Sequence, residues 1–328
     1  MGSEATVRVR GSGRNGATPS RPFLRGMALG HYTDLPRVEL AAKLRELKAL
    51  GASHVSIVAQ WSTRDVRSTS IAPRPDHTTP DAVLERMIAH ARTQGLSVLL
   101  FPILDVQRRK PLEWRGTLKP TDWDAWWRSY RRFILHYARL AARTRAAILC
   151  VGSELVTTEG MRERWVELIA EVRKVYRGAL LYSANWDHFE PVSFWEHVDL
   201  VGVTAYHSLA QKNDAPEEEM YLSWLRVRDT LGRWSRRLAR PFIFTEVGYP
   251  SQDGGAVHPW DYTQGTAADP EEQRRAYRAF VRAWHGDKTL AGVFFWDWYG
   301  SGGLMDTQYT PRHKPAESVI RHWFRSRR

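Results

Sequence analysis

Two glutamates close apolar stretches of this sequence, and their positions raise the question of what chemistry they do. Glu246 follows the run Phe242-Ile243-Phe244, and Glu154 comes soon after "AAILCVG" (146–152). A carboxylate is costly to bury unless it is paired, so each either forms an ion pair or has a chemical task such as nucleophilic or acid/base catalysis. The structural alternatives are an arginine partner for Glu246 and a favourable helix N-terminus for Glu154.

The elements that position these glutamates follow a regular alternation. Apolar runs rich in β-branched and aromatic residues alternate with segments of helical period. We predict strands at 23–30, 54–61, 97–104, 146–152, 179–185, 198–206, 241–247 and 290–298. We predict helices at 36–50, 80–94, 121–143, 159–176, 217–238, 270–285 and 314–325, so that only the fifth connection, near 189–197, is short. Thr79 and Asp269, each before a proline, are predicted to cap two of these helices.

Eight such units in this length predict the α/β class and a single (β/α)8 TIM barrel. We assign the barrel to residues 23–328 and a disordered leader to 1–22. A doubly wound open sheet is the rival fold, but "MALGHYTD" after the first strand lacks the three-glycine phosphate turn.

Composition narrows the range of partners. The net charge of +12 could indicate a nucleic-acid partner, yet the basic residues are spread over helical segments, so we expect none. No stretch is apolar enough for a membrane span, and no signal peptide is visible at the start. The single cysteine, Cys150, lies in an apolar run and is predicted to be a core residue.

The predicted strand ends carry carboxylates, amides and aromatic rings. Aromatic rings stack on the apolar faces of sugars, and carboxylates and amides bind hydroxyls, so this set fits a carbohydrate cleft. The candidates are Trp61, Glu154, Asn185, Trp186, Tyr206, His207, Glu246 and Trp296. For the three tryptophans, packing at the barrel rim is an equal alternative, whereas for His207 the structural reading, a satisfied polar residue, is the favoured one.

Glu154 and Glu246 end the fourth and seventh predicted strands. An eight-stranded barrel has a radius of about 7 to 8 Å, which places those strand ends roughly 14 Å apart. Two inward glutamates then leave about 5 to 6 Å between carboxyl groups, close to the ~5 to 5.5 Å of retaining glycosidases and below the ~6.5 to 9.5 Å of inverting ones.

The sequence resembles glycoside hydrolase family 113, the retaining β-1,4-mannanases of the large clan of (β/α)8 β-glycosidases. The likeness runs from about residue 24 to 325, and its most specific segments are "VGSEL" (151–155), "YSANWD" (182–187), "FTEVGYPSQDGGAVHPWDY" (244–262) and "TPRHKPAESVI" (310–320).

The resemblance implies that Glu154 is the general acid/base and that Glu246 is the nucleophile, kept ionised by hydrogen bonds from neighbours such as Tyr206. Many clan members carry asparagine before the acid/base, where this chain has Ser153, and Asn185 is our candidate to contact the sugar 2-hydroxyl instead. The implied sugar-binding residues are Trp61, Trp186 and Trp296 from strand ends, with Trp114 and Arg115 from the loop after the third strand. Trp114 and Arg115 could instead hold that loop through a cation–π contact.

The implied activity is that of a retaining endo-β-1,4-mannanase acting on mannan or glucomannan, with a β-linked polysaccharide or oligosaccharide as its partner. No metal or cofactor is expected, since neither HExxH nor His-x-His at a strand end is present. We take a monomer as the default and expect an extracellular or periplasmic location from the substrate class. Two alternatives stay open: a retaining β-glycosidase for glucan, xylan or an exopolysaccharide, and a barrel that binds carbohydrate without turnover.

Overall fold

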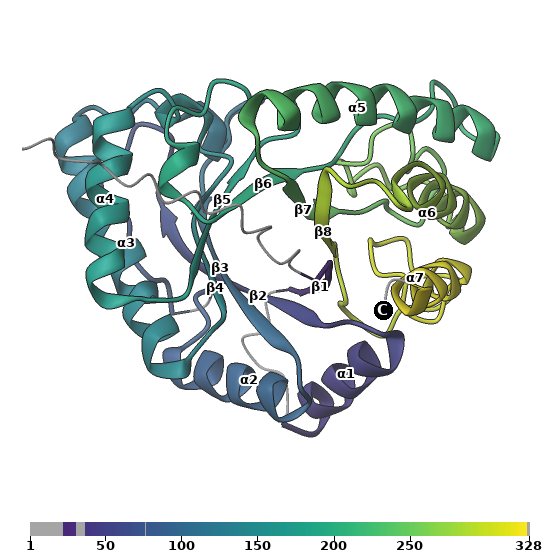
Figure 1. Cartoon of the computed structure of the whole chain (residues 1–328), viewed down its shortest axis with the longest axis horizontal. Coiled ribbons are helices and arrows are strands. Elements are labelled where there is room, and N and C mark those ends of the chain that lie inside the picture. Colours follow the sequence, from purple (N-terminus) through teal and green to yellow (C-terminus); the bar gives the residue numbers. More distant parts are fainter. Residues whose placement is uncertain (1–21, 31–36, 76, 327–328) are drawn as a thin grey trace, which may run out of the picture.

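The computed structural model describes residues 22–30, 37–75 and 77–326, and within them eight parallel strands form a closed barrel in sequence order (Figure 1). The first strand pairs with the last, with Leu24 opposite Gly292. The strands are β1 (Leu24–Leu29), β2 (His54–Thr63), β3 (Ser97–Val106), β4 (Ile148–Ser153), β5 (Ala179–Ala184), β6 (Leu200–Thr204), β7 (Phe242–Val247) and β8 (Leu290–Phe295). The predicted TIM barrel is therefore confirmed.

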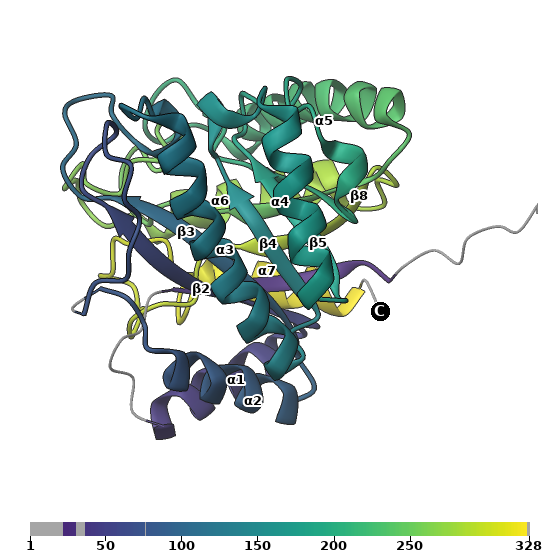
Figure 2. The same ribbon diagram turned by 90° about the vertical axis from the view of Figure 1, so that its left-hand side faces the viewer.

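Helices surround the barrel, and Figure 2 shows α3 and α4 lying in front of β3, β4 and β5. They are α1 (Arg37–Leu50), α2 (Asp81–Thr93), α3 (Trp123–Thr144), α4 (Arg162–Val175), α5 (Glu217–Leu238), α6 (Pro270–Trp284) and α7 (Pro315–Ser326). The connection from β5 to β6 holds only a single-turn 3₁₀ helix, η3 (Trp195–His197), as its short length predicted. Nearly all of the predicted leader, 1–22, lies outside the described residues.

The two predicted helix caps differ in outcome. Asp269 caps α6, because its side chain accepts hydrogen bonds from the backbone N–H groups of Glu271 and Glu272, with Pro270 at the first helical position. The prediction for Thr79 was wrong. α2 begins one residue later than expected, so Pro80 occupies the cap position and no side chain caps the helix.

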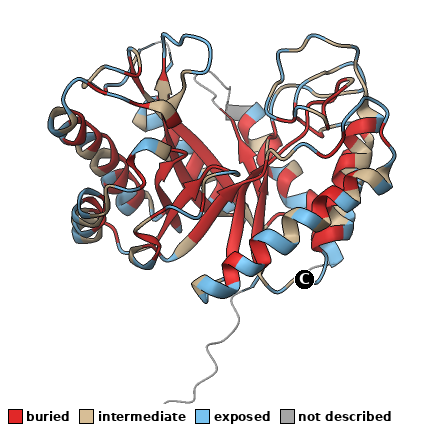
Figure 3. Ribbon diagram, turned by 90° about the horizontal axis from the view of Figure 1, so that it is seen from above, coloured by how far each residue is buried: buried red, intermediate tan, exposed pale blue. Residues whose placement is uncertain are grey.

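Two apolar layers fill the molecule, and Figure 3 shows the strands buried at its centre. The larger layer lies between strands and helices, and a smaller cluster fills the barrel itself. Leu99, Phe101 and Ile103 belong to the smaller cluster, which fits the alternation of side chains along β3. Cys150 lies in the same cluster as a free, buried thiol, and burial raises its pKa well above the usual range. Across the described residues, no helix combines the length and apolar character needed to cross a membrane.

Candidate active site

Glu154 stands at a strained turn directly after β4. Its backbone adopts a left-handed conformation with φ of +54°, which non-glycine residues rarely do. Two hydrogen bonds hold this turn: the Glu154 N–H donates to the Ser183 carbonyl at 2.8 Å, and the Leu155 N–H donates to the Tyr182 hydroxyl at 3.2 Å. The Tyr182 hydroxyl in turn donates to the fully buried Glu159 carboxylate at 2.6 Å. The turn is thus anchored from the neighbouring strand β5.

The Glu154 carboxylate has a partner for each oxygen. Arg115, from the 3₁₀ helix η1 (Arg115–Thr117) in the loop after β3, donates to Oε2 at 2.5 Å. Thr204, the last residue of β6, donates to Oε1 at 2.8 Å. Thr204 is also paired in register with Glu246 on β7, so Glu154 reaches across to the strand that adjoins Glu246.

Glu246 lies within β7 and is 5% exposed. Ile243 faces the barrel interior, so strict alternation would turn Glu246, three residues later, towards the helices. The β7 ladder is irregular between Phe244 and Val247, and such irregularities re-aim side chains. Oε2 of Glu246 accepts a hydrogen bond from the Tyr206 hydroxyl at 2.7 Å, whereas Oε1 is buried and has no hydrogen-bond partner among the described residues.

The electrostatics of the pair differ from the expectation that Glu246 is simply kept ionised. Burial, together with the negative charge of Glu154, raises the pKa of Glu246 to about 7, although Arg115 and the Tyr206 hydrogen bond oppose the rise. Burial lowers the pKa of Arg115, but the charges of both glutamates outweigh that effect and raise it. The predicted Tyr206 hydrogen bond is present, yet desolvation is the larger influence on the nucleophile candidate.

A family model, Glycoside Hydrolase Family 113, matches residues 29–316. The chain belongs to glycoside hydrolase family 113. A solved structure of a family 113 β-mannanase from Alicyclobacillus acidocaldarius, in complex with ManMIm, is 29% identical, covers 94% of this chain and 99% of its own, and superposes with a TM-score of 0.83. A family 113 β-1,4-mannanase described as a complex structure is 26% identical over 93% of this chain and 100% of its own, also with a TM-score of 0.83.

A β-glucuronidase from Ruminococcus gnavus shares the barrel fold at 13% identity, with a TM-score of 0.62 over 92% of this chain and 50% of its own. The search of curated proteins found no match. Because it belongs to family 113, this chain is a glycoside hydrolase. In the described part of the chain, no group of three or more histidine, cysteine or acidic side chains could hold a metal ion.

Of the aromatic residues predicted to bind sugar, Trp61 lies elsewhere. Its ring packs against Phe133, His136 and Tyr137 of α3, with centroid distances of 5.5, 5.1 and 6.2 Å. It therefore stands on the outer side of β2, because Val58, three residues earlier, faces the barrel interior. Trp296, directly after β8, instead packs against the apolar cluster inside the barrel.

The loop residues Trp114 and Arg115 do not form the cation–π contact that was the alternative to sugar binding. Arg115 forms an ion pair with Glu154. The Trp114 ring instead packs against Gly116 of the same turn, so closely that a Cβ added at Gly116 would lie 2.3 Å from the ring. Arg115 therefore belongs to the carboxylate pair itself. At the position where many clan members carry asparagine, the Ser153 hydroxyl is buried and has no partner in the part of the chain described.

Asn185, Trp186 and His207 gather at the ends of β5 and β6. The Asn185 amide donates to Asp187 at 2.5 Å, so its contact with a sugar hydroxyl would have to compete with that bond. The Trp186 ring is nearly parallel to Trp260, at 11° and 6.2 Å between centroids, and the His207 ring meets it edge-on at 5.1 Å.

Thr204 and Trp260 are the functional candidates that our sequence prediction missed. A hydroxyl at the end of the sixth strand was a visible signal for Thr204. Trp260 lies in the long loop after β7, where no periodicity marks which side chains meet the residues at the strand ends.

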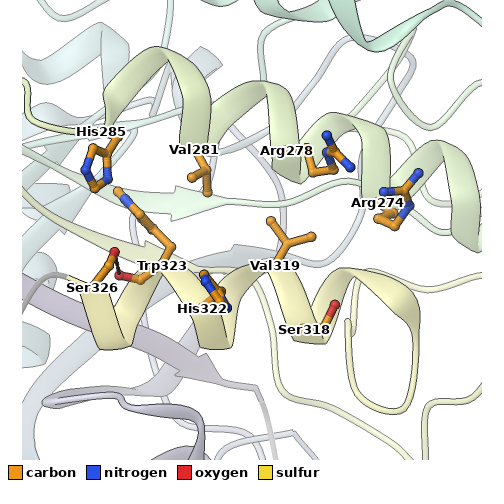
Figure 4. A pocket seen from close by; sticks show the side chains of 9 residues that line it. All are labelled: Arg274, Arg278, Val281, His285, Ser318, Val319, His322, Trp323 and Ser326. Atoms are coloured by element: carbon orange, nitrogen blue, oxygen red, sulfur yellow. Dashed lines mark hydrogen bonds between the residues drawn. The ribbon is translucent and has the colours of Figure 1, made fainter.

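A hollow of about 590 Å³ lies between α6 and α7, on the helical side of the barrel (Figure 4). Its lining includes Arg274 and Arg278, which form ion pairs with Glu271 at 2.6 Å and with Glu217 at 2.7 Å. Because these cations are already neutralised and the hollow is remote from the strand ends, we assign no chemistry to it.

Proposed function

We propose that this chain is a retaining endo-β-1,4-mannanase that cleaves mannan and glucomannan by double displacement. One observation carries the proposal. Among the described residues, Oε1 of Glu246 is buried without a hydrogen-bond partner and the charge of Glu154 acts on this carboxyl group, in a chain whose solved relatives at 26% and 29% identity are described as mannanases. The β4 and β7 origins of the two glutamates support the same roles.

In the first step, Oε1 of Glu246 bonds to the anomeric carbon while the glycosidic carbon–oxygen bond breaks. Glu154 gives its proton to the leaving oxygen, and the product is a covalent glycosyl-enzyme. In the second step, Glu154 takes a proton from water as the water oxygen bonds to the anomeric carbon and Glu246 leaves as a carboxylate.

The reaction requires one proton on the pair, located on Glu154 when the bond breaks. In the empty cleft, the pKa of about 7 for Glu246 lets it hold that proton up to near neutral pH, while Arg115 is paired with Glu154. For the first step, the proton must lie on Glu154 and Glu246 must be ionised. Tyr206 then supports the ionised Glu246 through its hydrogen bond.

The first experiment measures reducing sugar released from β-mannan, glucomannan, xylan, cellulose and mixed-linkage glucan. We expect release from the first two by the native protein and none by Glu246→Ala. A matched control is Glu218→Ala, which removes an exposed carboxylate on α5 and should leave the rate unchanged. Release from xylan or glucan with mannan untouched would overturn the mannanase proposal and leave the hydrolase assignment standing.

Azide distinguishes retention from inversion. In Glu246→Ala it can enter the space of the lost carboxylate and form an α-mannosyl azide from an aryl mannoside. In Glu154→Ala it can attack the glycosyl-enzyme from the opposite face and form the β-mannosyl azide. Proton NMR assigns the anomer, and failure to obtain both products would contradict the double displacement.

A further inference from the structure

A second hollow, of about 540 Å³, adjoins the candidate active site. It lies between the loop that follows β5 and the face of α5 that carries Arg226 and Thr230, next to His207. His207 directly follows Tyr206, whose hydroxyl contacts Glu246, and Trp186 lies two residues beyond the end of β5. Two residues of its lining, Trp186 and His207, therefore come from the same strand ends as the candidate active site.

The lining combines an apolar floor with groups that bind hydroxyls. Phe189 and Leu231 are buried in the floor, and the ring of Trp186 forms one wall. Asp187, Glu190, Arg226 and Thr230 provide carboxylate, guanidinium and hydroxyl groups around it. An apolar surface with a few polar groups is the pattern that binds a pyranose, which has an apolar ring face and hydroxyls at its edge.

The charges around the hollow favour an uncharged ligand over an anion. Glu190 already pairs with Arg237 at 2.9 Å, and Asp187 accepts the hydrogen bond from Asn185. An anionic ligand would face both carboxylates, with Arg226 as the cation in the lining. A neutral sugar avoids that repulsion and can donate its hydroxyls to the carboxylate oxygens.

His207 adds a neutral polar ring to the lining of the hollow. Its Nε2 is shielded from solvent and has no hydrogen-bond partner among the residues that the structure describes. Burial lowers the pKa of His207 to about 3, so the ring is neutral at working pH and one ring nitrogen is an acceptor. Because Nε2 is shielded, a ligand in the hollow meets the other atoms of the His207 ring.

We propose that the hollow between Trp186 and α5 is a subsite that holds a pyranose unit of the glycan, away from the bond that is cleaved. This inference rests on the proposed function, because it takes the ligand to be part of the same chain that occupies the cleft. The subsite makes the enzyme favour long oligosaccharides over short ones.

The test fills the hollow. Thr230→Trp on the exposed face of α5 places an indole into the space, and Asp229→Trp adds the same side chain at an exposed neighbouring position that does not line it. Both are made in the Glu246→Gln background, and calorimetry measures the Kd of mannose oligosaccharides from two to six units. We expect Thr230→Trp to weaken hexasaccharide binding about tenfold and to leave disaccharide binding unchanged, since about 1.4 kcal/mol corresponds to a factor of ten. Asp229→Trp should bind every length as the parent does.

Arg226→Ala is a milder second variant. It removes the guanidinium group without filling the hollow, and it should weaken hexasaccharide binding by a smaller factor than Thr230→Trp. Equal binding of all lengths by Thr230→Trp and its parent would overturn the subsite while mannan hydrolysis by the native protein kept the proposed function intact. If Asp229→Trp weakened hexasaccharide binding as much as Thr230→Trp does, that result would also overturn the subsite. If the native protein does not cleave mannan, the same Kd measurements with glucose and xylose oligosaccharides of two to six units test the subsite separately.

Discussion

Glu154 and Glu246 are both buried at strand ends of the barrel, but the chain holds them in different ways. Glu154 sits on a left-handed turn and has a partner on each oxygen, Arg115 and Thr204. Glu246 lies inside a strand and keeps one oxygen without a partner in the described structure. Both glutamates are thus restrained at the backbone, but only Glu154 has a partner on each carboxylate oxygen.

This difference matches the two tasks. A nucleophile must meet one carbon atom at a fixed place, so a rigid strand behind a free oxygen suits it. An acid/base must exchange its proton with a leaving group and then with water, so its carboxylate needs partners that can be replaced. The costs also differ, because the free oxygen of Glu246 is buried without compensation, whereas the cost at Glu154 is backbone strain.

The largest expected effect separates the two roles by leaving group. Glu246→Gln should reduce kcat/KM about 10⁴-fold or more on mannan and on a dinitrophenyl mannobioside, because both need the nucleophile. Glu154→Gln should lose about 10² to 10⁴-fold on mannan but far less on the dinitrophenyl substrate, whose leaving group needs no proton. Steady-state rates on the two substrates check this. If both variants lost similar factors of kcat/KM on both substrates, the assignment of nucleophile and acid/base to different glutamates would be contradicted.

The turn that aims Glu154 gives the next largest effect. Tyr182→Phe removes the hydroxyl that accepts from Leu155 and donates to Glu159, so kcat on mannan should fall about tenfold as the carboxylate loses its aim. The loss of kcat should be smaller on the dinitrophenyl substrate, because its leaving group needs no proton from Glu154. Tyr176→Phe is the matched control, since that buried hydroxyl bonds the Ala146 carbonyl before β4 begins. An equal loss of kcat in both variants would reduce the role of Tyr182 to general stability.

The pH dependence of kcat/KM should respond in opposite directions to the two partners of Glu246. Glu154 raises the pKa of Glu246 and Arg115 lowers it. A dinitrophenyl substrate needs no proton from Glu154, so its cleavage should increase as Glu246 of the free enzyme loses its proton near pH 7. For the dinitrophenyl substrate, Glu154→Gln should move the acid limb to lower pH and Arg115→Gln should move it to higher pH. Each shift should be about one unit. Arg131→Gln, on the surface of α3, serves as a control, and shifts of the same sign would contradict this electrostatic coupling.

The positions of both glutamates at strand ends could be predicted from the sequence, because apolar runs mark buried strands and parallel barrels gather function at their carboxyl ends. The sequence does not show which side chains of a strand face the barrel interior and which face the helices. Both faces of a barrel strand are buried, so the apolar run at 54–61 does not show which face Trp61 occupies. The interior position of Val58 decides that Trp61 faces outward.

Glu246 illustrates the opposite case. Counting from Ile243 would turn its side chain outward, and only the irregular ladder near the end of β7 permits its contact with Tyr206. Such an irregularity depends on the neighbouring strands and leaves no local pattern. The same applies to Arg115, because the direction of a loop side chain is set by the partner it meets, which here comes from β4.

A stability measurement, independent of catalysis, tests the cost of the Glu246 oxygen that has no partner among the residues described. A carboxyl group whose folded pKa is raised from 4.5 to about 7 stabilises the fold fully only below its unfolded pKa and loses that contribution as pH rises through 7. The loss is on the order of 3 kcal/mol for a shift of this size. Glu246→Gln keeps the shape without the charge, so its Tm should exceed that of the native protein by several degrees at pH 8 and by little at pH 4.5. Calorimetric scans from pH 4.5 to 8 measure the difference, with Glu218→Gln as an exposed control. A Tm difference that stays constant with pH would show that desolvation of the charge is not what Glu246 costs the fold.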